Sequence, residues 1–243
     1  MGDAIIYEAE VTGMPVRAVY SQKSVEKVFL PLIEDLRALR KEKGRRILVF
    51  LAAPPAAGKS TLSGFLATLC PEMTVLAMDG YHHYQSWLLE HTTIRNGKTV
   101  PMVSVKGAPE TFDLEKLQKD LARAAAGEII GWPIYDRAGH DPVENAVTAE
   151  GGILLLEGNY LLLDEAGWRD LKQYADYTIM IRAEESMLRP RLIERKLNLG
   201  RTQAEAEKFA DESDLPNARL ILRRSSPADL TLRLTETGEY RPE

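Results

Sequence analysis

The chain has 243 residues, of which 44% are hydrophobic and 28% charged, and this balance is typical of a globular protein with one large α/β core. Its net charge of −5 argues against a broad nucleic-acid-binding surface, because such surfaces are rich in Lys and Arg. Cys70 is the one cysteine, so no intramolecular disulfide can form, and the sequence has neither a signal-like start nor a long apolar run. We therefore expect a cytoplasmic, single-domain protein that binds neither nucleic acid nor membranes. A homodimer stays open as an alternative to a monomer.

The first segment with a clear pattern is the N-terminal one. Residues 4–19 alternate loosely and are interrupted by Thr12-Gly13-Met14-Pro15, which predicts a small hairpin. From Ser24 onward, apolar residues recur at the helical period until Gly44, and basic residues fill the last turn. We expect residues 1–44 to form a hairpin and a helix that pack on a main domain of residues 45–243.

An apolar strand at 46–52 then leads into Gly58-Lys59-Ser60-Thr61, which opens a helix at 59–70. This pattern predicts a phosphate-binding loop. Backbone N–H groups of Ala57 to Thr61 would surround the phosphates, the Lys59 ammonium would reach the terminal ones, and the Ser60 hydroxyl is suited to Mg²⁺. Ala53 stands where the Gly-x4-Gly-Lys-Ser/Thr pattern has its first glycine, so we expect a negative φ there.

Strands and helices alternate through the rest of the chain, which predicts a mainly parallel sheet covered on both faces, a three-layer α/β/α sandwich. Strands are expected at 74–78, 153–157, 176–181, 219–223 and 230–234, and helices at 113–126, 184–198 and 203–211. About thirty residues before the 113–126 helix lack a period and are rich in Tyr, His and Trp, as in a lid or binding surface, with a hairpin turn expected at Asn96-Gly97.

Two carboxylates follow strands of the expected sheet. Asp79 comes directly after the strand at 74–78, at the carboxyl edge where the phosphate loop also lies, so it is placed to accept a proton from a substrate hydroxyl. Its alternative role is to cap a turn before Gly80. Glu157 ends the strand at 153–157 and is placed to hold Mg²⁺, the alternative being a simple ion pair with Lys59.

Four further segments carry a family resemblance. They are Asp79-Gly80-Tyr81-His82, Lys106 to Asp113, Pro133 to Arg137, and Leu156 to Tyr160. Their order resembles that of the P-loop kinases that include uridine kinase, pantothenate kinase and phosphoribulokinase, most of all bacterial members of nucleoside-kinase or fructose-kinase type. The similarity runs from about Ile47 to Leu234, and it implies a P-loop NTPase-type fold with a helical lid at about 184–211.

The resemblance also implies cofactors and roles. ATP and Mg²⁺ would be bound by Lys59, Ser60 and Thr61, Asp79 would act as the base, and Glu157 would support the metal. Acceptor-facing side chains would be Tyr135, Arg137 and His140. The family often has a phenylalanine and a downstream histidine near Arg137, so nucleobase recognition is not implied. Lid arginines would stabilise the transferring phosphoryl group, and we expect at least one of Arg191, Arg195 and Arg201 to reach phosphate, the alternative being a solvated charged helix.

Polar and aromatic residues after the second strand of the main domain are candidates for binding the acceptor. Tyr81 and His82 offer hydrogen bonds and stacking, whereas adjacent histidines in an extended segment point to opposite faces and make a poor metal site. Lys106 is either a substrate-binding cation or a solvated loop lysine.

Together these features predict an ATP-dependent kinase that phosphorylates a hydroxyl of a small polar metabolite: a nucleoside, a sugar or a pantothenate-like alcohol. The alternative is a nucleotide-dependent switch or a non-catalytic ATP-binding protein. The sequence lacks the Asn-Lys-x-Asp guanine reader of GTPases, and Lys59, Asp79 and Glu157 are all present, which favours the enzyme.

Overall fold

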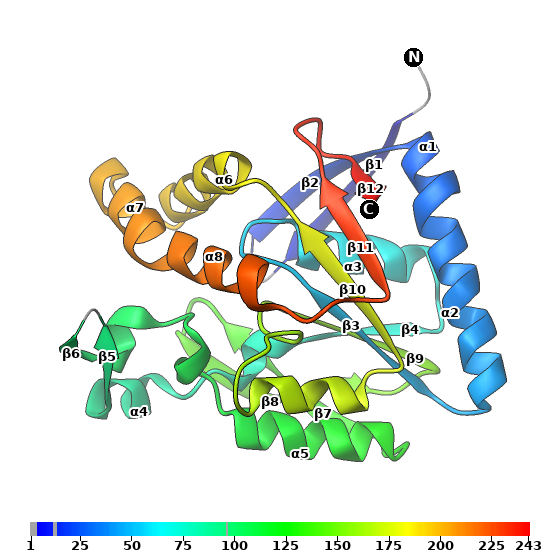
Figure 1. Cartoon of the computed structure of the whole chain (residues 1–243), viewed down its shortest axis with the longest axis horizontal. Coiled ribbons are helices and arrows are strands. Elements are labelled where there is room, and N and C mark those ends of the chain that lie inside the picture. The colour runs from blue at the N-terminus through cyan, green and yellow to red at the C-terminus, as the bar shows by residue number, and fades with distance from the viewer. Residues whose placement is uncertain (1–3, 12–13, 96) are drawn as a thin grey trace.

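The computed structural model describes residues 4–11, 14–95 and 97–243 and is built around a six-stranded sheet of order β12-β11-β10-β3-β9-β4 (Figure 1). Neighbouring strands are parallel except at the β11–β12 edge, which is antiparallel. The strands are β3 (Ile47–Ala52), β4 (Met73–Ala77), β9 (Ile153–Gly158), β10 (Tyr177–Arg182), β11 (Leu230–Leu234) and β12 (Tyr240–Pro242). The expected mainly parallel sheet is confirmed.

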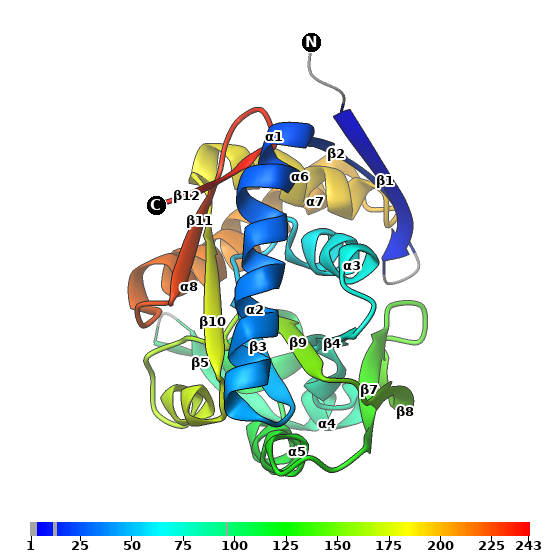
Figure 2. The same ribbon diagram turned by 90° about the vertical axis from the view of Figure 1, so that its right-hand side faces the viewer.

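Both faces of the sheet are buried, because the side chains of β3 alternate between two cores. Ile47, Val49 and Leu51 face the core under the helices α2 (Leu30–Lys43) and α3 (Lys59–Leu69), which Figure 2 shows crossing that face. Leu48 and Phe50 face the core under α5 (Leu114–Ala125) and the 3₁₀ helix η5 (Trp168–Tyr174). The three layers predicted from the alternation of elements are therefore present.

The remaining helices lie at the ends of the strands and in the connections between them. They are α1 (Gln22–Ser24), α4 (Gln85–Glu90), α6 (Glu185–Leu197), α7 (Gln203–Phe209) and α8 (Leu215–Arg224), the π-helical turns η1 (Val25–Phe29) and η6 (Ala210–Asp214), and the 3₁₀ turns η2 (Met78–Tyr81), η3 (Met102–Val105) and η4 (Pro109–Thr111). No helix in the described part of the chain is both long enough and apolar enough to span a bilayer.

The N-terminal segment forms the predicted hairpin and helix. Strands β1 (Ala4–Val11) and β2 (Met14–Ser21) pair antiparallel, while Thr12 and Gly13 of the predicted turn lie outside the described residues. Helical residues then run from Gln22 to Lys43 and end at Gly44, which adopts φ 64 and donates its N–H to the Arg40 and Lys41 carbonyls.

A cluster of aromatic rings joins this N-terminal segment to the C-terminal strand. The Tyr20 ring of β2 stacks on Phe65 of α3 at 4.4 Å between ring centres and meets Phe29 edge to face. Tyr240 of β12 packs against Phe29 at 6.1 Å. The N-terminal and C-terminal segments of the described chain therefore meet at α3, the helix that follows the phosphate loop.

Two expectations about elements are wrong or incomplete. Residues 219–223, predicted as a strand, lie within α8, which has Pro216 in its first turn, and a short apolar run does not distinguish a strand from a buried helix. The antiparallel pair β7 (Ile130–Asp136) and β8 (Asp141–Ala149) was not predicted, and an irregularity between Trp132 and Ile134 interrupts its alternation. A short hairpin, β5 (Thr92–Arg95) and β6 (Lys98–Pro101), surrounds the predicted Asn96-Gly97 turn, of which Asn96 lies outside the described residues.

Candidate active site

A cleft of about 970 Å³ lies at the carboxyl edge of the sheet. In Figure 1 the lid helices α6 and α7 and the segment α4–β5–β6 project from this same end of the molecule. Most of the predicted site residues line the cleft. They are Gly58, Lys59, Ser60 and Thr61 from the phosphate loop, Asp79 and His82 after β4, Lys106, Tyr135, Arg137 and His140 beyond them, and Arg195 and Arg201 from the predicted lid.

The phosphate loop connects β3 to α3 through residues 53–58. Ala53 is fully buried and is not among the residues with positive φ, as expected; the left-handed positions are instead Ala56 at φ 63 and Gly58 at φ 83. The N–H groups of Lys59, Ser60 and Thr61 stand in the first turn of α3, where a helix has no internal acceptors for them. These donors face the cleft, and the helix dipole adds to their preference for an anion.

Ala57 differs from the other predicted phosphate contacts. Its N–H donates to the Pro54 carbonyl at 3.3 Å within the loop, and its carbonyl accepts the Tyr240 hydroxyl at 3.1 Å. A Cβ added at Gly58 would lie 2.6 Å from the Tyr240 hydroxyl oxygen. Ala57 therefore links the loop to the C-terminal strand, and the structure does not place it in the lining of the cleft.

Lys59, Ser60 and Glu157 form a buried polar group below the loop. The Ser60 hydroxyl donates to Glu157 Oε1 at 2.7 Å, and Lys59 Nζ lies 3.6 Å from Glu157 Oε2. That Oε2 atom is buried and accepts no hydrogen bond from any described residue. Burial raises the pKa of Glu157, and the positive charge of Lys59 offsets only part of this effect. The Glu157 carboxylate therefore forms the predicted ion pair with Lys59, and its Oε2 atom still lacks a hydrogen-bond donor.

Asp79 lies in η2, two residues past the end of strand β4. Its Oδ2 is 3.9 Å from the Arg137 guanidinium. Burial by itself raises the pKa of the Asp79 carboxyl, but Lys59, His82, Arg137 and Arg195 outweigh this effect and leave the pKa below its ordinary value. Asp79 is therefore a carboxylate at neutral pH.

Strand β7 fixes the position of η2. The Trp132 indole N–H donates to the Ala77 carbonyl at 2.9 Å, and Trp132 itself is completely buried. Gly80 is packed so tightly that a Cβ there would lie 2.1 Å from the Pro133 carbonyl oxygen. The backbone on either side of Asp79 is therefore held by β7, which the sequence did not reveal as a strand.

His82 lines the cleft close enough to Asp79 for the two charges to interact. Its ring stacks on Phe112 at 3.8 Å and meets Tyr135 at 5.3 Å, and its Nδ1 lies 3.3 Å from the Thr111 carbonyl oxygen. Burial lowers the pKa of His82 to about 4, although the Asp79 charge acts in the opposite direction. The imidazole is therefore neutral at physiological pH.

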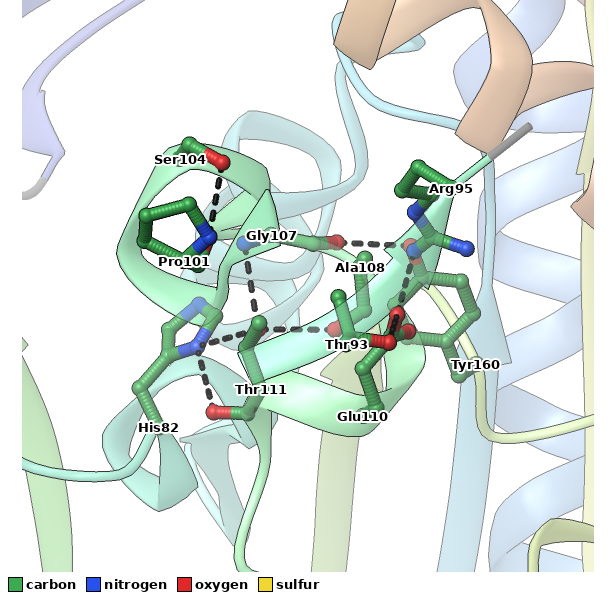
Figure 3. A network of polar contacts seen from close by, with 10 residues as sticks. All are labelled: His82, Thr93, Arg95, Pro101, Ser104, Gly107, Ala108, Glu110, Thr111 and Tyr160. Carbon is green, nitrogen blue, oxygen red and sulfur yellow. Dashed lines mark hydrogen bonds and ion pairs between the residues drawn. The ribbon is translucent and has the colours of Figure 1, made fainter. Parts of the chain in front are cut away.

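The loop between η3 and η4 carries Lys106 into the cleft, and a polar network fixes its backbone (Figure 3). The Tyr160 hydroxyl donates to the Gly107 carbonyl at 2.6 Å, and the Gly107 N–H donates to the Thr111 hydroxyl oxygen at 3.1 Å. The Thr111 hydroxyl in turn donates to the Ala108 carbonyl at 2.7 Å. Lys106 thus projects from a rigid turn.

Helix α6 and the segment after it contribute cations to the cleft lining, and the Arg195 charge acts on the pKa of Asp79. Arg195 Nη2 lies 3.4 Å from Asp214 Oδ2, and Lys196 Nζ lies 3.8 Å from the same oxygen and 3.5 Å from the centre of the Phe209 ring. Burial lowers the pKa of Lys196 to about 8, the Asp214 charge opposing the shift. Arg191, by contrast, is on the same helix but does not line the cleft.

Two more predicted site residues are absent from the cleft lining: Glu157, which lies below it against Lys59 and Ser60, and Tyr81. Tyr81 is almost fully buried, its hydroxyl donates to Asp120 at 2.9 Å, and its ring packs on Trp132. Conversely, sequence reasoning missed Lys196, Asp214 and Asn159, which do line the cleft. Asn159 has a buried Oδ1 without a hydrogen-bond partner among the described residues. Its position two residues after Glu157, at the end of the same strand, is the sequence feature that could have indicated a place in the site. No cluster of three or more His, Cys, Asp or Glu suited to a metal ion occurs in the described ranges.

Comparisons with known proteins add relatives along most of the chain. No family model matches the sequence. The uncharacterised protein YggC of Escherichia coli K12 is 41% identical over 240 residues, which cover 96% of this chain and 97% of YggC. A putative uridine kinase of Schizosaccharomyces pombe is 29% identical over 201 residues, covering 77% and 83% of the two chains. The crystal structure of a putative fructose transport system kinase from Silicibacter sp. TM1040 matches with a TM-score of 0.69 and 35% identity, over 81% of this chain and 98% of that one.

Proposed function

Since this chain belongs to the P-loop kinases, the family of uridine kinase, pantothenate kinase and phosphoribulokinase, we propose that it transfers the γ-phosphoryl group of ATP to a hydroxyl of a small polar metabolite. The observation that carries this proposal is the meeting of three parts in one cleft: the phosphate loop, the lid cations and the Asp79 carboxylate. A nucleotide-dependent switch needs the phosphate loop and one carboxylate for the metal, a role that Glu157 is suited to here, so the second carboxylate, Asp79, is left for an acceptor. The arrangement therefore favours transfer to an acceptor.

Phosphate binding is assigned to the first turn of α3 and to the lid. The N–H groups of Lys59, Ser60 and Thr61 bind phosphate oxygens, and the Lys59 ammonium neutralises the terminal ones. Arg195, Lys196 and Arg201 line the same cleft and would stabilise the charge that spreads over the transferring group.

The residues present fit a magnesium ion. Glu157 Oε2 is a buried carboxylate oxygen without a hydrogen-bond donor, and the Ser60 hydroxyl lies 2.7 Å from the other oxygen of the same group. Mg²⁺ prefers carboxylate, hydroxyl and phosphate oxygens, so Ser60 and Glu157 would hold it beside the phosphates. When bound, the ion supplies positive charge that bridges and neutralises phosphate oxygens.

Asp79 is assigned as the general base. Its lowered pKa keeps it ionised at neutral pH, and as a carboxylate it accepts the proton of the attacking hydroxyl. Arg137, at 3.9 Å, stabilises the ionised form and so limits the basicity of the carboxylate. Because the reaction depends mainly on positioning and electrostatics, the base contributes about 10²–10⁴-fold to the rate.

The test measures ADP release from ATP and Mg²⁺ by the full chain, with and without a panel of hydroxyl compounds that includes nucleosides, sugars and hydroxy acids. We expect one class of compound to stimulate release. Asp79→Asn should lower that stimulated kcat by about 10²–10⁴-fold and leave the affinity for ATP within a few fold, because the phosphate contacts are unchanged.

Asp170→Asn is the matched control, since Asp170 is an exposed carboxylate on η5 that lies outside the cleft lining. It should leave both kcat and ATP affinity unchanged. ADP release that no acceptor stimulates would favour a nucleotide-dependent switch, and near wild-type turnover by the Asp79→Asn protein would remove Asp79 from the mechanism.

A further inference from the structure

Positive charge is present on both sides of Asp79 in the cleft. Lys59, Arg195, Lys196 and Arg201 lie toward the phosphate loop and the lid, where the nucleotide phosphates belong in the proposed function. Two more cations, Lys106 and Arg137, lie on the acceptor side, and their charges both act on the pKa of His82. The second pair is not required for binding ATP.

Arg137 already has a role toward the carboxylate of Asp79, which it approaches to 3.9 Å. Lys106 differs, because no carboxylate within the described part of the chain lies in ion-pair range of its ammonium, which donates to the His140 carbonyl at 2.7 Å. Its Nζ also lies 4.8 Å from the centre of the Tyr135 ring. An ammonium has three N–H donors, so most of the hydrogen-bonding capacity of Lys106 remains for a ligand.

The surroundings of Lys106 make this charge costly without a ligand. Burial lowers the pKa of its ammonium, and the charge of Asp141 opposes the shift, although the Oδ1 of that carboxylate accepts the Gln85 N–H at 2.6 Å. The backbone that carries Lys106 is fixed by Tyr160 and Thr111, which holds the partly buried ammonium at the cleft. A partly desolvated cation on a rigid support is the usual arrangement for binding an anion.

We infer that the acceptor of this kinase carries an anionic group, a carboxylate or a phosphate, in addition to the hydroxyl that is phosphorylated, and that Lys106 binds this group. The inference rests on the proposed kinase function. It places the hydroxyl at Asp79 and the anionic end of the same molecule at Lys106, with the Tyr135 ring beside it. A neutral sugar or nucleoside would leave the Lys106 ammonium without a counter-charge.

Matched pairs of acceptors test the inference with the full chain, ATP and Mg²⁺. Each hydroxy acid is compared with its primary amide, and each sugar phosphate with its parent sugar; neutral nucleosides complete the panel. We expect the anionic member of one pair to have a kcat/KM at least about tenfold higher than its neutral partner. Hydroxy acids and sugar phosphates form separate arms, so the active arm identifies the anionic group as a carboxylate or a phosphate.

Substitution of Lys106 supplies the second measurement. Lys106→Met keeps the length of the side chain and removes the charge, and we expect it to raise the KM of the anionic acceptor by roughly 10–100-fold while the KM of ATP stays within twofold. Lys98→Met, an exposed lysine on β6 outside the cleft lining, is the control and should change neither value.

Two results would overturn the inference, and they are distinguishable. Equal or preferential use of the neutral partners, or an unchanged acceptor KM in the Lys106→Met protein, contradicts the anionic acceptor and leaves the kinase activity in place. If no member of the panel stimulates ADP release by a protein that still binds ATP, the kinase proposal fails, and the inference fails with it.

Discussion

At the scale of single residues, the cleft holds ionisable groups whose charges depend on burial as much as on their neighbours. Asp79 and Glu157 are two carboxylates near the same ammonium, Lys59, yet the pKa of Asp79 is lowered and that of Glu157 is raised. The difference follows from the number of cations around each group. Divergent pKa values among neighbouring carboxylates are common at catalytic sites.

Lys196 gives a prediction about pH. Its pKa of about 8 in the folded protein lies below the ordinary lysine value of 10.5, so the ammonium loses its proton as the pH rises through about 8. Below pH 8 the buried ammonium is charged and lowers the free energy of unfolding by its full burial cost. Between pH 8 and pH 10.5 Lys196 is neutral in the folded protein but still protonated in the unfolded chain, so the free energy of unfolding rises with pH. Bound phosphate favours the charged form, so the affinity for ATP should fall up to about tenfold between pH 8 and pH 9.

The measurement is the Kd of ATP with Mg²⁺ from pH 7 to pH 9 for wild type and Lys196→Arg. Arginine keeps its charge throughout this range, so the variant should show a flat profile above pH 7.5. A wild-type affinity that does not change with pH, or an equal slope in the two proteins, would contradict the role given to Lys196.

At the scale of elements, the sequence predicted the parts of the sheet that carry phosphate chemistry better than the parts that hold them in place. The runs at 46–52 and 153–157 are buried on both faces and read as continuous apolar strands, which β3 and β9 confirm within a residue at each end. The helices expected at 184–198 and 203–211 correspond to α6 and α7 within two residues at each end. Basic residues fill the last turn of α6, and a capping box at Thr202 begins α7.

Elements that depend on tertiary contacts were missed. Strand β7 contains Pro133, and its pairing with β8 is irregular between Trp132 and Ile134, so its side chains do not follow a regular two-residue polar and apolar pattern. Its packing against η2, at the Pro133 carbonyl, is visible only in the folded structure. Residues 219–223 form a helix because Pro216 and the buried Ile221 face suit α8, a choice that an apolar run of that length leaves open. In the site, the residues named from motifs mostly line the cleft, whereas the Tyr81 hydroxyl donates to Asp120 on α5, away from the cleft lining.

Gly80 tests the support that β7 gives to the base. Gly80→Ala places a Cβ 2.1 Å from the Pro133 carbonyl oxygen, so the η2 backbone must move, and Asp79 moves with it. We expect a loss of about 1–3 kcal/mol in the free energy of unfolding and a fall in kcat of at least tenfold, with the Kd of ATP little changed. Denaturant unfolding, steady-state kinetics and ATP titration measure the three quantities.

Gly44→Ala serves as the comparison because nothing lies within 4 Å of a Cβ at Gly44, although its φ of 64 is unfavourable for alanine. It should cost about 1 kcal/mol of stability and leave kcat unchanged. If Gly80→Ala behaved like this control, β7 would not position the base.

At the scale of the whole molecule, segments far apart in the chain support the phosphate loop together. The hairpin β1–β2 brings Tyr20 onto α3, and β12 brings Tyr240 to the Ala57 carbonyl, across a sequence separation of 183 residues. The hydroxyl of Tyr240 also lies against the surface of Gly58. The conformation of the loop thus depends on contacts from both terminal segments of the described chain.

Tyr240→Phe removes the hydroxyl and keeps the ring in the aromatic cluster. The buried Ala57 carbonyl then lacks its donor, so we expect a loss of about 1–3 kcal/mol in stability and an increase of about threefold to tenfold in the Kd of ATP. Tyr20→Phe removes a hydroxyl from the same cluster without altering a contact to the loop, and it should leave the Kd of ATP unchanged. Equal ATP affinities in wild type and the Tyr240→Phe protein would show that the loop keeps its shape unaided.

The order of strands has a consequence for synthesis. The central strand β3 pairs with β9 and β10, which are translated long after it, and the loop that follows β3 receives its last support from Tyr240. At roughly 5–20 residues per second, a ribosome needs about ten to forty seconds to add the intervening chain. The phosphate loop is therefore made before the strands that flank β3 and before the Tyr240 contact, so a nascent chain that stops before Tyr240 holds the motif without this support for the loop.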